Sequence, residues 1–217
     1  MRIILMMGPQ GSGKGTQAER LADRLGIPAI SLGQMLRAEA ESGSELGRQM
    51  AETMKRGDRL PEPMVNRMAY ERLLRPDCVH GAILDGYPRS VEQTHDLDAM
   101  LKGIGAAVTD AVLLNISDEE AMRRLSGRWV CSNTACEAKY NVAAQRSKVE
   151  GVCDRCGSRL VQRADDTPEG IRHRLEVYHR DTEPIFGHYI ERGVLREING
   201  EQSIEAVSAE MFRALEV

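Results

Sequence analysis

Near its N-terminus the chain carries an apolar run that leads directly into a glycine-rich loop ending in a lysine. The run covers residues 3–7, and the loop that follows spans residues 8–16. Glycines let successive backbone N–H groups turn toward one anion, and the helix expected after the loop presents its positive end to the same place. The spacing of Gly8, Gly13 and Lys14 is typical of a P-loop, which predicts a nucleoside triphosphate as ligand.

One position departs from that motif. A P-loop normally continues from its lysine to a serine or threonine whose hydroxyl ligates Mg²⁺, whereas here Gly15 follows Lys14 and Thr16 comes one place later. We therefore expect Mg²⁺ to be held mainly through water molecules and another carboxylate. Asp85, which closes the apolar run 81–84, is the candidate for that carboxylate.

Apolar runs alternate with amphipathic stretches along the chain, which predicts an α/β fold with a doubly wound parallel sheet. We expect strands at 28–32, 81–85, 111–116 and 193–198, and helices at 17–25, from Ser117 onward, at 167–189 and at 203–215. Residues 34–74 read as a helical insert interrupted at Gly57, Pro61 and Pro63. A chain of 217 residues is long enough for one such core with small excursions.

Composition excludes several classes of protein. Hydrophobic residues make up 41% and charged residues 29% of the chain, and no apolar run approaches the length that spans a membrane. The first residues show no leader, so we expect a cytoplasmic protein. A net charge of −4 with 4% aromatic residues disfavours a general nucleic-acid binder.

Four of the five cysteines form two close pairs, Cys131-x₄-Cys136 and Cys153-x₂-Cys156. Clustered thiols in a chain without a leader favour a metal over disulfides. The second pair, followed by Gly157, is typical of a zinc knuckle, and the first pair is spaced more loosely. We predict a structural zinc site; a redox pair or cysteines without metal remain the alternatives.

Arginines occur at several places that the fold brings toward the ligand. They are Arg37, Arg89, Arg128, Arg163 and Arg174. Guanidinium groups hold donor and acceptor phosphates in line and neutralise charge on the group being moved, so this composition predicts phosphoryl transfer. A phosphate acceptor is already anionic at neutral pH, so we expect no general base.

Ordered motifs extend this reading along nearly the whole chain. They are Gly8–Thr16 with Gln17, Leu32-Gly33-Gln34-Met35-Leu36-Arg37, Asp85-Gly86-Tyr87-Pro88-Arg89 with Gln93, Gly127-Arg128, and Arg163-Ala164-Asp165-Asp166 with Arg174. In these motifs the sequence resembles the adenylate kinases, specifically the bacterial form with a long, zinc-bearing lid. The resemblance implies a P-loop core at 1–30, 61–126 and 167–217, a segment binding the nucleoside monophosphate at 31–60, and a lid at 127–166.

The resemblance also implies the ligands: ATP, AMP and ADP, with Mg²⁺ accompanying ATP, in a monomer that needs no nucleic acid or membrane. The residues implied for ATP are Gly11, Ser12, Gly13, Lys14, Gly15, Thr16, Arg124, Arg128, Lys139, Tyr140 and Gln202. Those implied for AMP are Leu32, Arg37, Asp58, Arg59, Leu60, Gly86, Tyr87, Pro88, Arg89, Gln93, Arg163 and Arg174. The implied catalytic residues are Lys14, Asp85, Arg89, Arg128, Arg163 and Arg174, and the implied zinc ligands are Cys131, Cys136, Cys153 and Cys156.

Two positions differ from the pattern of that family. Leu32 stands where a threonine hydroxyl usually helps to recognise adenine, and one lost hydrogen bond costs about 0.5–1.5 kcal/mol, or roughly tenfold in affinity. We expect AMP to remain the preferred acceptor, with a smaller advantage in kcat/KM over the other nucleoside monophosphates. A nucleoside monophosphate kinase with another base preference is the alternative. The other difference is the longer Cys131–Cys136 spacing.

A protein of a different class, a zinc ribbon that binds nucleic acid and is fused to a P-loop switch, is the other alternative.

Overall fold

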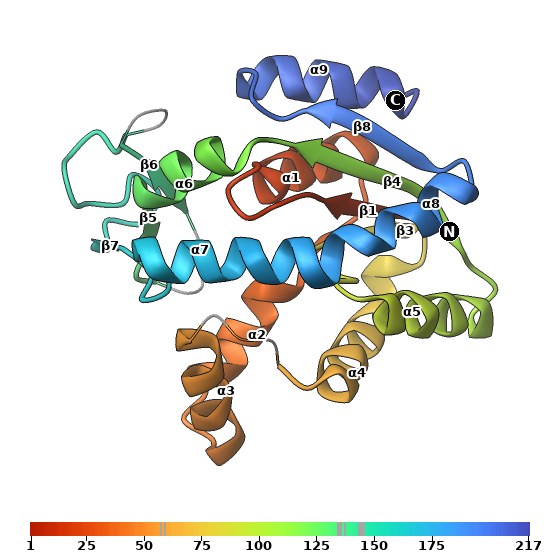
Figure 1. The fold of residues 1–217 in the computed structure, drawn as a ribbon, viewed down its shortest axis with the longest axis horizontal. Helices are drawn as coiled ribbons and strands as arrows, with labels where there is room; N and C mark the ends of the chain where they lie inside the picture. Colours follow the sequence, from red (N-terminus) through yellow and green to blue (C-terminus); the bar gives the residue numbers. More distant parts are fainter. Residues whose placement is uncertain (57, 59, 134–135, 137, 143–145) are drawn as a thin grey trace.

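The structure is a computed structural model that describes residues 1–56, 58, 60–133, 136, 138–142 and 146–217. Within them, five parallel strands form a central sheet in the order β2-β3-β1-β4-β8 (Figure 1). The strands are β1 (Arg2–Met7), β2 (Ala29–Ser31), β3 (Gly81–Asp85), β4 (Val108–Asn115) and β8 (Leu195–Asn199). Met6 lies opposite Asp85 in the register of β1 and β3, so the loop after β1 begins beside that carboxylate.

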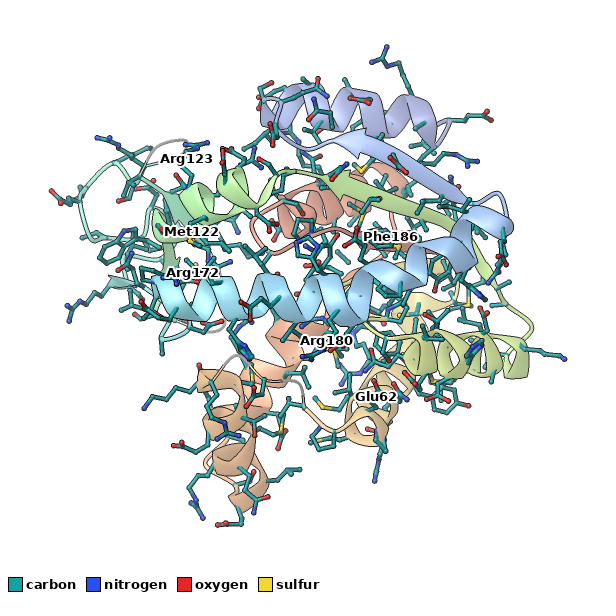
Figure 2. The ribbon with its side chains drawn as sticks, viewed as in Figure 1. Glu62, Met122, Arg123, Arg172, Arg180 and Phe186 are labelled. Carbon is teal, nitrogen blue, oxygen red and sulfur yellow. The ribbon has the colours of Figure 1, made fainter. Side chains whose placement is uncertain are left out.

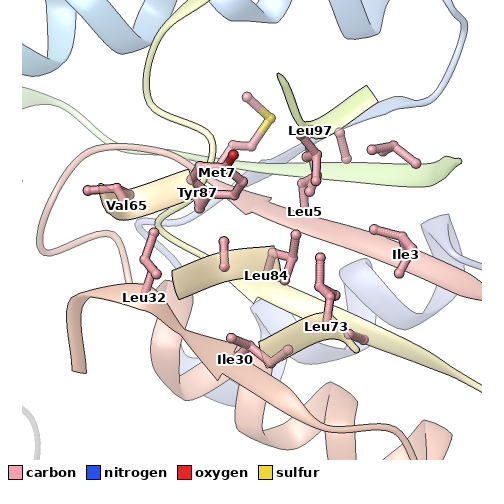
Figure 3. Packing of buried hydrophobic residues seen from close by; sticks show 14 of the residues in the cluster. Ile3, Leu5, Met7, Ile30, Leu32, Val65, Leu73, Leu84, Tyr87 and Leu97 are labelled. Carbon is pink, nitrogen blue, oxygen red and sulfur yellow. The ribbon is translucent and has the colours of Figure 1, made fainter. Parts of the chain in front are cut away.

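Both faces of the sheet are covered by helices, which confirms the doubly wound fold. Alternate residues of β1 enter different cores: Ile3 and Leu5 pack on one face, whereas Ile4 and Met6 pack on the other. Figure 3 shows part of the first core around Leu5, Leu84 and Leu97. Helices α4 (Glu62–Leu73), α5 (Val91–Gly103) and α8 (Phe186–Glu191) contribute to this core, together with the helical insert described below. Helices α1 (Lys14–Leu25) and α9 (Ile204–Ala214) contribute to the second core.

The helical insert leaves the sheet after β2 and projects from the core as α2 (Leu32–Ala40) and α3 (Glu45–Lys55) (Figure 1). The predicted strand 28–32 was too long, because Leu32 already begins α2. The insert also breaks at 41–44, where Gly43 has a φ of 79°. Pro63 does not interrupt a helix but lies in the first turn of α4, a position that tolerates a residue without an N–H group. Gly57 lies outside the described residues.

The cysteine-bearing segment forms a separate three-stranded antiparallel sheet, in the order β6-β5-β7. Its strands are β5 (Arg128–Cys131), β6 (Lys139–Asn141) and β7 (Leu160–Val161). The chain reaches this small sheet through α6 (Asp118–Ser126) and returns through α7 (Pro168–Val177). The buried residues Cys131, Tyr140, Cys153 and Leu160 make a small apolar cluster of their own.

The helix predicted over 167–189 is one rod in outline, but its hydrogen bonding changes along its length (Figure 1). After α7 come a π-helical turn at Tyr178–Thr182 and a 3₁₀ turn at Glu183–Ile185, and only then α8. Pro184 has no N–H group to donate, so a regular α-helix cannot run through it.

Ser117, Thr167 and Ser203, the residues at which three of the predicted helices begin, each accept a hydrogen bond from the backbone N–H three residues later. Glu120 does not complete a capping box with Ser117, because the N–H of Ser117 donates to the Glu201 carboxylate at 2.8 Å. Among the described helices, none combines the length and the apolar character needed to cross a membrane.

Candidate active site

A cavity of about 670 Å³ lies at the carboxyl edge of the central sheet and is lined by the P-loop, the helical insert and the small sheet. Its volume is in the range of cofactor and substrate sites. Of the residues expected to bind ATP, it is lined by Gly11, Ser12, Gly13, Lys14, Gly15, Thr16, Arg124, Arg128, Lys139, Tyr140 and Gln202. Of those expected to bind AMP or to act in catalysis, it is lined by Leu32, Arg37, Asp58, Leu60, Asp85, Gly86, Arg89, Gln93, Arg163 and Arg174.

Two of the described residues expected at the site, Tyr87 and Pro88, are not in this lining. The Tyr87 ring is buried among apolar residues and its hydroxyl donates to Asn66 at 2.8 Å, while its neighbour Pro88 also lies outside the cavity wall. Arg59 lies outside the described residues. Tyr87 therefore supports the cavity from behind.

The P-loop presents its backbone as the sequence predicts. Gly13 precedes α1 with a φ of 95°, in the left-handed region, and no side chain caps the helix. The first N–H groups of α1 are thus left to an anion. Lys14 Nζ donates to the carbonyl oxygens of Gly8 and Pro9, both at 2.7 Å. Burial lowers the pKa of Lys14 to about 8, although the Asp85 carboxylate acts in the opposite direction.

Arg163 is the clearest sign of an anion site. Its guanidinium lines the cavity and has no hydrogen bond or ion pair with any of the residues that the structure describes. Burial, followed by repulsion from Arg128 and Arg37, lowers the pKa of Arg163 to about 9. Three guanidinium groups brought together in a half-buried cavity favour a multiply charged anion.

Two aspartates hold the other arginines in place. Asp166, whose side chain is fully buried, accepts from Arg128 at 2.6 and 2.8 Å and from Arg174 at 2.8 Å. Asp165 accepts from Arg174 at 2.6 Å. These contacts join the beginning of the small sheet to α7, so the two arginines are fixed at the junction of the cysteine-bearing segment with the core.

Two arginines and a glutamine form another pocket in the wall of this cavity. Arg37 and Arg89 converge on Gly33, where a Cβ would lie 3.3 Å from Arg37 Nη1 and 3.8 Å from Arg89 Nη2. Gln93 is 3% exposed and its Oε1 accepts from the N–H of Arg89 at 2.8 Å. Its amide NH₂ group is therefore the donor left for a ligand.

The apolar wall of this pocket was only partly anticipated. Leu32 is 2% exposed and lies in the same hydrophobic cluster as Val65 (Figure 3), and the partly buried Met54 packs against that cluster. All three residues line the cavity. Met54 belongs to the stretch that the sequence predicts as a helical insert, and the sequence gives it no ligand role. Nothing in the local sequence distinguishes a methionine that faces a cavity from one that faces a core.

A contact between the helical insert and α7 was not foreseen either. Asp58 accepts from Arg56 Nε at 2.8 Å and lies 3.2 Å from His173 Nε2. The hydrogen bonds from Arg56 and then His173 lower the pKa of Asp58. Sequence alone gave His173 no role.

The four clustered cysteines face one another. Their sulfur atoms all lie within 4.8 Å, with Cys131 to Cys156 at 3.4 Å and Cys136 to Cys153 at 3.7 Å. Four thiolates around a tetrahedral ion at about 2.3 Å stand about 3.8 Å apart, so this donor set fits a metal of the zinc type. The hydroxyl of the buried Tyr140 lies 3.6 Å from Cys153 Sγ.

Polar side chains surround the junction between the small sheet and the core. In Figure 2, Arg123 on α6 and Arg172 on α7 lie at the end of the molecule that carries this sheet. Arg124, beside Arg123, donates to the carbonyl oxygen of Gly200 at 2.9 Å and to Glu120 at 2.6 Å. It thereby ties α6 to the loop after β8, where Gln202 lines the cavity.

A P-loop on a parallel sheet, with an arginine-lined acceptor pocket across the cavity, defines a P-loop kinase that phosphorylates a small anionic acceptor. The family model for adenylate kinase matches residues 6–194. The adenylate kinase of Rhizobium rhizogenes is 43% identical over 96% of this chain and 96% of the relative. That of Thermodesulfovibrio yellowstonii is also 43% identical, over 100% of this chain and 99% of the relative. That of Archaeoglobus fulgidus is 39% identical over 98% of this chain and 97% of the relative.

The chain belongs to the adenylate kinase family. The match includes the cysteine-bearing segment together with the P-loop. The two are parts of one kinase architecture, and the nucleic-acid ribbon considered from the sequence is set aside.

Proposed function

We propose that this member of the family catalyses the reversible transfer of the terminal phosphoryl group of ATP to AMP, giving two ADP, and so balances the adenine nucleotides of the cell. The observation that carries the proposal is the pair of buried cations in one cavity. Lys14 is bonded only to neutral acceptors, and Arg163 has no partner among the described residues. Burial of such groups is unfavourable unless an anion comes to them.

The two substrates bind to different parts of the cavity. The P-loop and Lys14 bind the phosphates of ATP, while Arg37 and Arg89 hold the phosphate of AMP on the other side of the cavity. An oxygen of that phosphate attacks the γ-phosphorus of ATP, and the bond from this phosphorus to the β–γ bridging oxygen breaks, leaving ADP. The acceptor oxygen carries no proton at neutral pH, so no base is needed.

Arg128, Arg163 and Arg174 surround the region between donor and acceptor, and we assign them to the charge on the transferred group. Arg128 and Arg174 are already oriented by Asp165 and Asp166. Fixed donors of this kind stabilise the transition state because they need not reorganise during the reaction. Arg124, Tyr140 and Gln202 complete the ATP side, and Leu32, Leu60 and Gln93 surround the acceptor base.

Two metals enter the proposal. Asp85, whose Oδ2 would lie 3.4 Å from a Cβ at Gly15 in the first turn of α1, would hold Mg²⁺ through water molecules, and the metal would supply positive charge to the phosphates of ATP. Zn²⁺ bound by Cys131, Cys136, Cys153 and Cys156 stabilises the small sheet, whose apolar cluster is too small to fold unaided. Metal analysis well below one zinc per chain, with all four cysteines titratable in the native protein, would rule out the zinc site.

The division into a core (1–30, 61–126 and 167–217), an acceptor segment (31–60) and a lid (127–166) is part of this proposal. It agrees with the two places where the chain leaves the central sheet, after β2 and after α6. We further propose a cytoplasmic monomer, since one chain supplies every element around the cavity.

The test is a coupled assay of ADP formation from ATP, Mg²⁺ and each of AMP, GMP, CMP and UMP. We expect the highest kcat/KM for AMP, over a margin narrowed by Leu32, whose side chain offers no hydrogen bond to the base. The second candidate, a kinase with another preferred acceptor, rests on the same leucine. A higher kcat/KM for any other monophosphate would establish it.

A further inference from the structure

The amide group of Gln93 is held by the backbone at the start of its own helix. Gln93 lies in the first turn of α5 and is buried in the wall of the cavity. Its Oε1 accepts from the N–H of Arg89, and its own N–H donates to Ser90 Oγ at 3.1 Å. The two residues that precede α5 therefore fix both the side chain and the backbone of Gln93, so any shift of these residues moves its amide group.

Ser90 is in turn held from another helix. Its hydroxyl, which is buried, donates to Glu62 Oε1 at 2.6 Å. A hydroxyl has one proton to donate and an oxygen that also accepts, so the bonds to Glu62 and from Gln93 form together. A short bond from a hydroxyl to a carboxylate is charge-assisted and stronger than a neutral one. Glu62 therefore fixes the orientation of the residue that caps α5.

Glu62 lies where the chain returns from the helical insert. It is the first residue of α4 and follows Leu60 by two positions, and Leu60 is a buried residue of the cavity wall. The bond from Ser90 to Glu62 joins residues that are 28 positions apart. It thereby links the end of the segment 31–60 to the turn that carries Gln93, and holds two walls of the acceptor pocket in register.

Arg89 is held on its other side by the long helical rod. Its carbonyl oxygen accepts from Thr182 Oγ1, in the π-helical turn, at 3.0 Å. The N–H group of the same residue is the donor that Gln93 accepts from. The arginine assigned to the acceptor phosphate and the glutamine assigned to the acceptor base thus form one unit, which is attached to the rod at Arg89 and to α4 at Ser90.

We propose that Glu62 and Ser90 are positioning residues for selection of the acceptor base: Glu62 orients Ser90, and Ser90 sets where Gln93 presents its NH₂ group. The proposal rests on the function proposed above and deepens it. Neither Glu62 nor Ser90 is among the described residues that line the cavity, so both act through Gln93. Adenine has an acceptor nitrogen at the ring position where guanine carries an N–H group, so a well-placed NH₂ donor favours AMP over GMP.

The first experiment compares Glu62→Ala, Ser90→Ala and Ser90→Thr with the control Glu92→Ala. Glu92 is an exposed acid in the same first turn of α5 and is not among the described residues that line the cavity, so its loss removes a similar charge near the same helix end. The coupled assay gives kcat and KM with AMP and with GMP.

We expect Glu62→Ala and Ser90→Ala to raise KM for AMP and to lower the ratio of kcat/KM between AMP and GMP by about 3- to 10-fold, because the hydrogen bond of Gln93 to the base is weakened. KM for ATP should stay as in wild type. Ser90→Thr keeps the hydroxyl and should keep the ratio. Loss of a helix cap also lowers stability, but a change in stability alone leaves the ratio for two acceptors unchanged.

The second experiment is a double-mutant cycle with Gln93→Ala. Residues that act through Gln93 have nothing to position once its amide is gone. Glu62→Ala should therefore lower the AMP to GMP ratio when Gln93 is present and leave it unchanged when Gln93→Ala is already in place.

Two results would overturn the proposal. One is a Glu62→Ala enzyme whose AMP to GMP ratio matches that of Glu92→Ala. The other is an equal fall in the ratio with and without the Gln93 amide, which would mean that Glu62 acts on the acceptor by another route. A wild-type protein that forms no ADP from ATP and AMP would instead refute the proposed function, and dissociation constants for AMP and GMP from calorimetry without ATP would still test Glu62 and Ser90.

Discussion

Replacing Asp166 by asparagine tests whether the buried carboxylate balances the arginines around it. Its side chain is fully buried and receives three hydrogen bonds, two from Arg128 and one from Arg174, whose side chains are only 18% and 10% exposed. Asparagine has nearly the same shape but no charge, and its NH₂ group meets an N–H donor. Removing one partner of a buried ion pair costs about 3–5 kcal/mol, because the remaining charge stays buried and unpaired.

The loss can be measured by urea and thermal unfolding. For a chain of this size, about 3–5 kcal/mol corresponds to a fall of about 6–20 °C in Tm. Asp165→Asn is the matched control: Asp165 is 25% exposed and accepts a single hydrogen bond from Arg174, so we expect a cost of about 1 kcal/mol. Inorganic phosphate should stabilise Asp166→Asn more than wild type, since the freed arginines gain an anion. A cost below 1 kcal/mol for Asp166→Asn, or equal costs for the two variants, would refute the reasoning.

Three further predictions follow from the site. The pKa of Lys14 falls from 10.5 to about 8 on folding, so between these pH values the native state binds fewer protons than the unfolded chain. The free energy of unfolding, measured in urea, should therefore rise more from pH 8 to pH 10 for wild type than for Lys14→Met. Leu32→Thr should widen the ratio of kcat/KM between AMP and GMP by up to about tenfold in the coupled assay, and an unchanged ratio would remove Leu32 from base recognition. Cys153→Ser should lower the zinc content measured by atomic absorption and the Tm of the small sheet, while the far-ultraviolet signal of the helices persists.

The parts of the fold that depend on neighbouring residues could be predicted from sequence. The strand leading into the P-loop follows from its continuous apolar run, and the Gly26 cap of α1 and the serine and threonine caps of later helices use local hydrogen bonds. The limits of prediction appear where distant residues decide. Glu201 replaces Glu120 as the acceptor for Ser117, and Leu32 enters a helix because its side chain packs in the core.

The candidate site shows the same limit. The P-loop and its lysine follow from spacing alone, and the arginines follow from composition and family resemblance. The close approach of the Lys139 ammonium group to Gly15 does not follow from spacing or composition, because it depends on where a strand of one segment passes a helix of another. That Arg163 has no side-chain partner among the described residues is likewise visible only once burial and neighbours are known.

The small apolar cluster around the cysteines has a consequence for local stability. It shares no member with the clusters that hold the central sheet together. The segment can therefore open and close as a cooperative unit while the sheet remains folded, and its amide protons should exchange with solvent deuterium long before those of β1 and β4. Metal supply would then set how often the enzyme is competent, without changing how much folded enzyme there is.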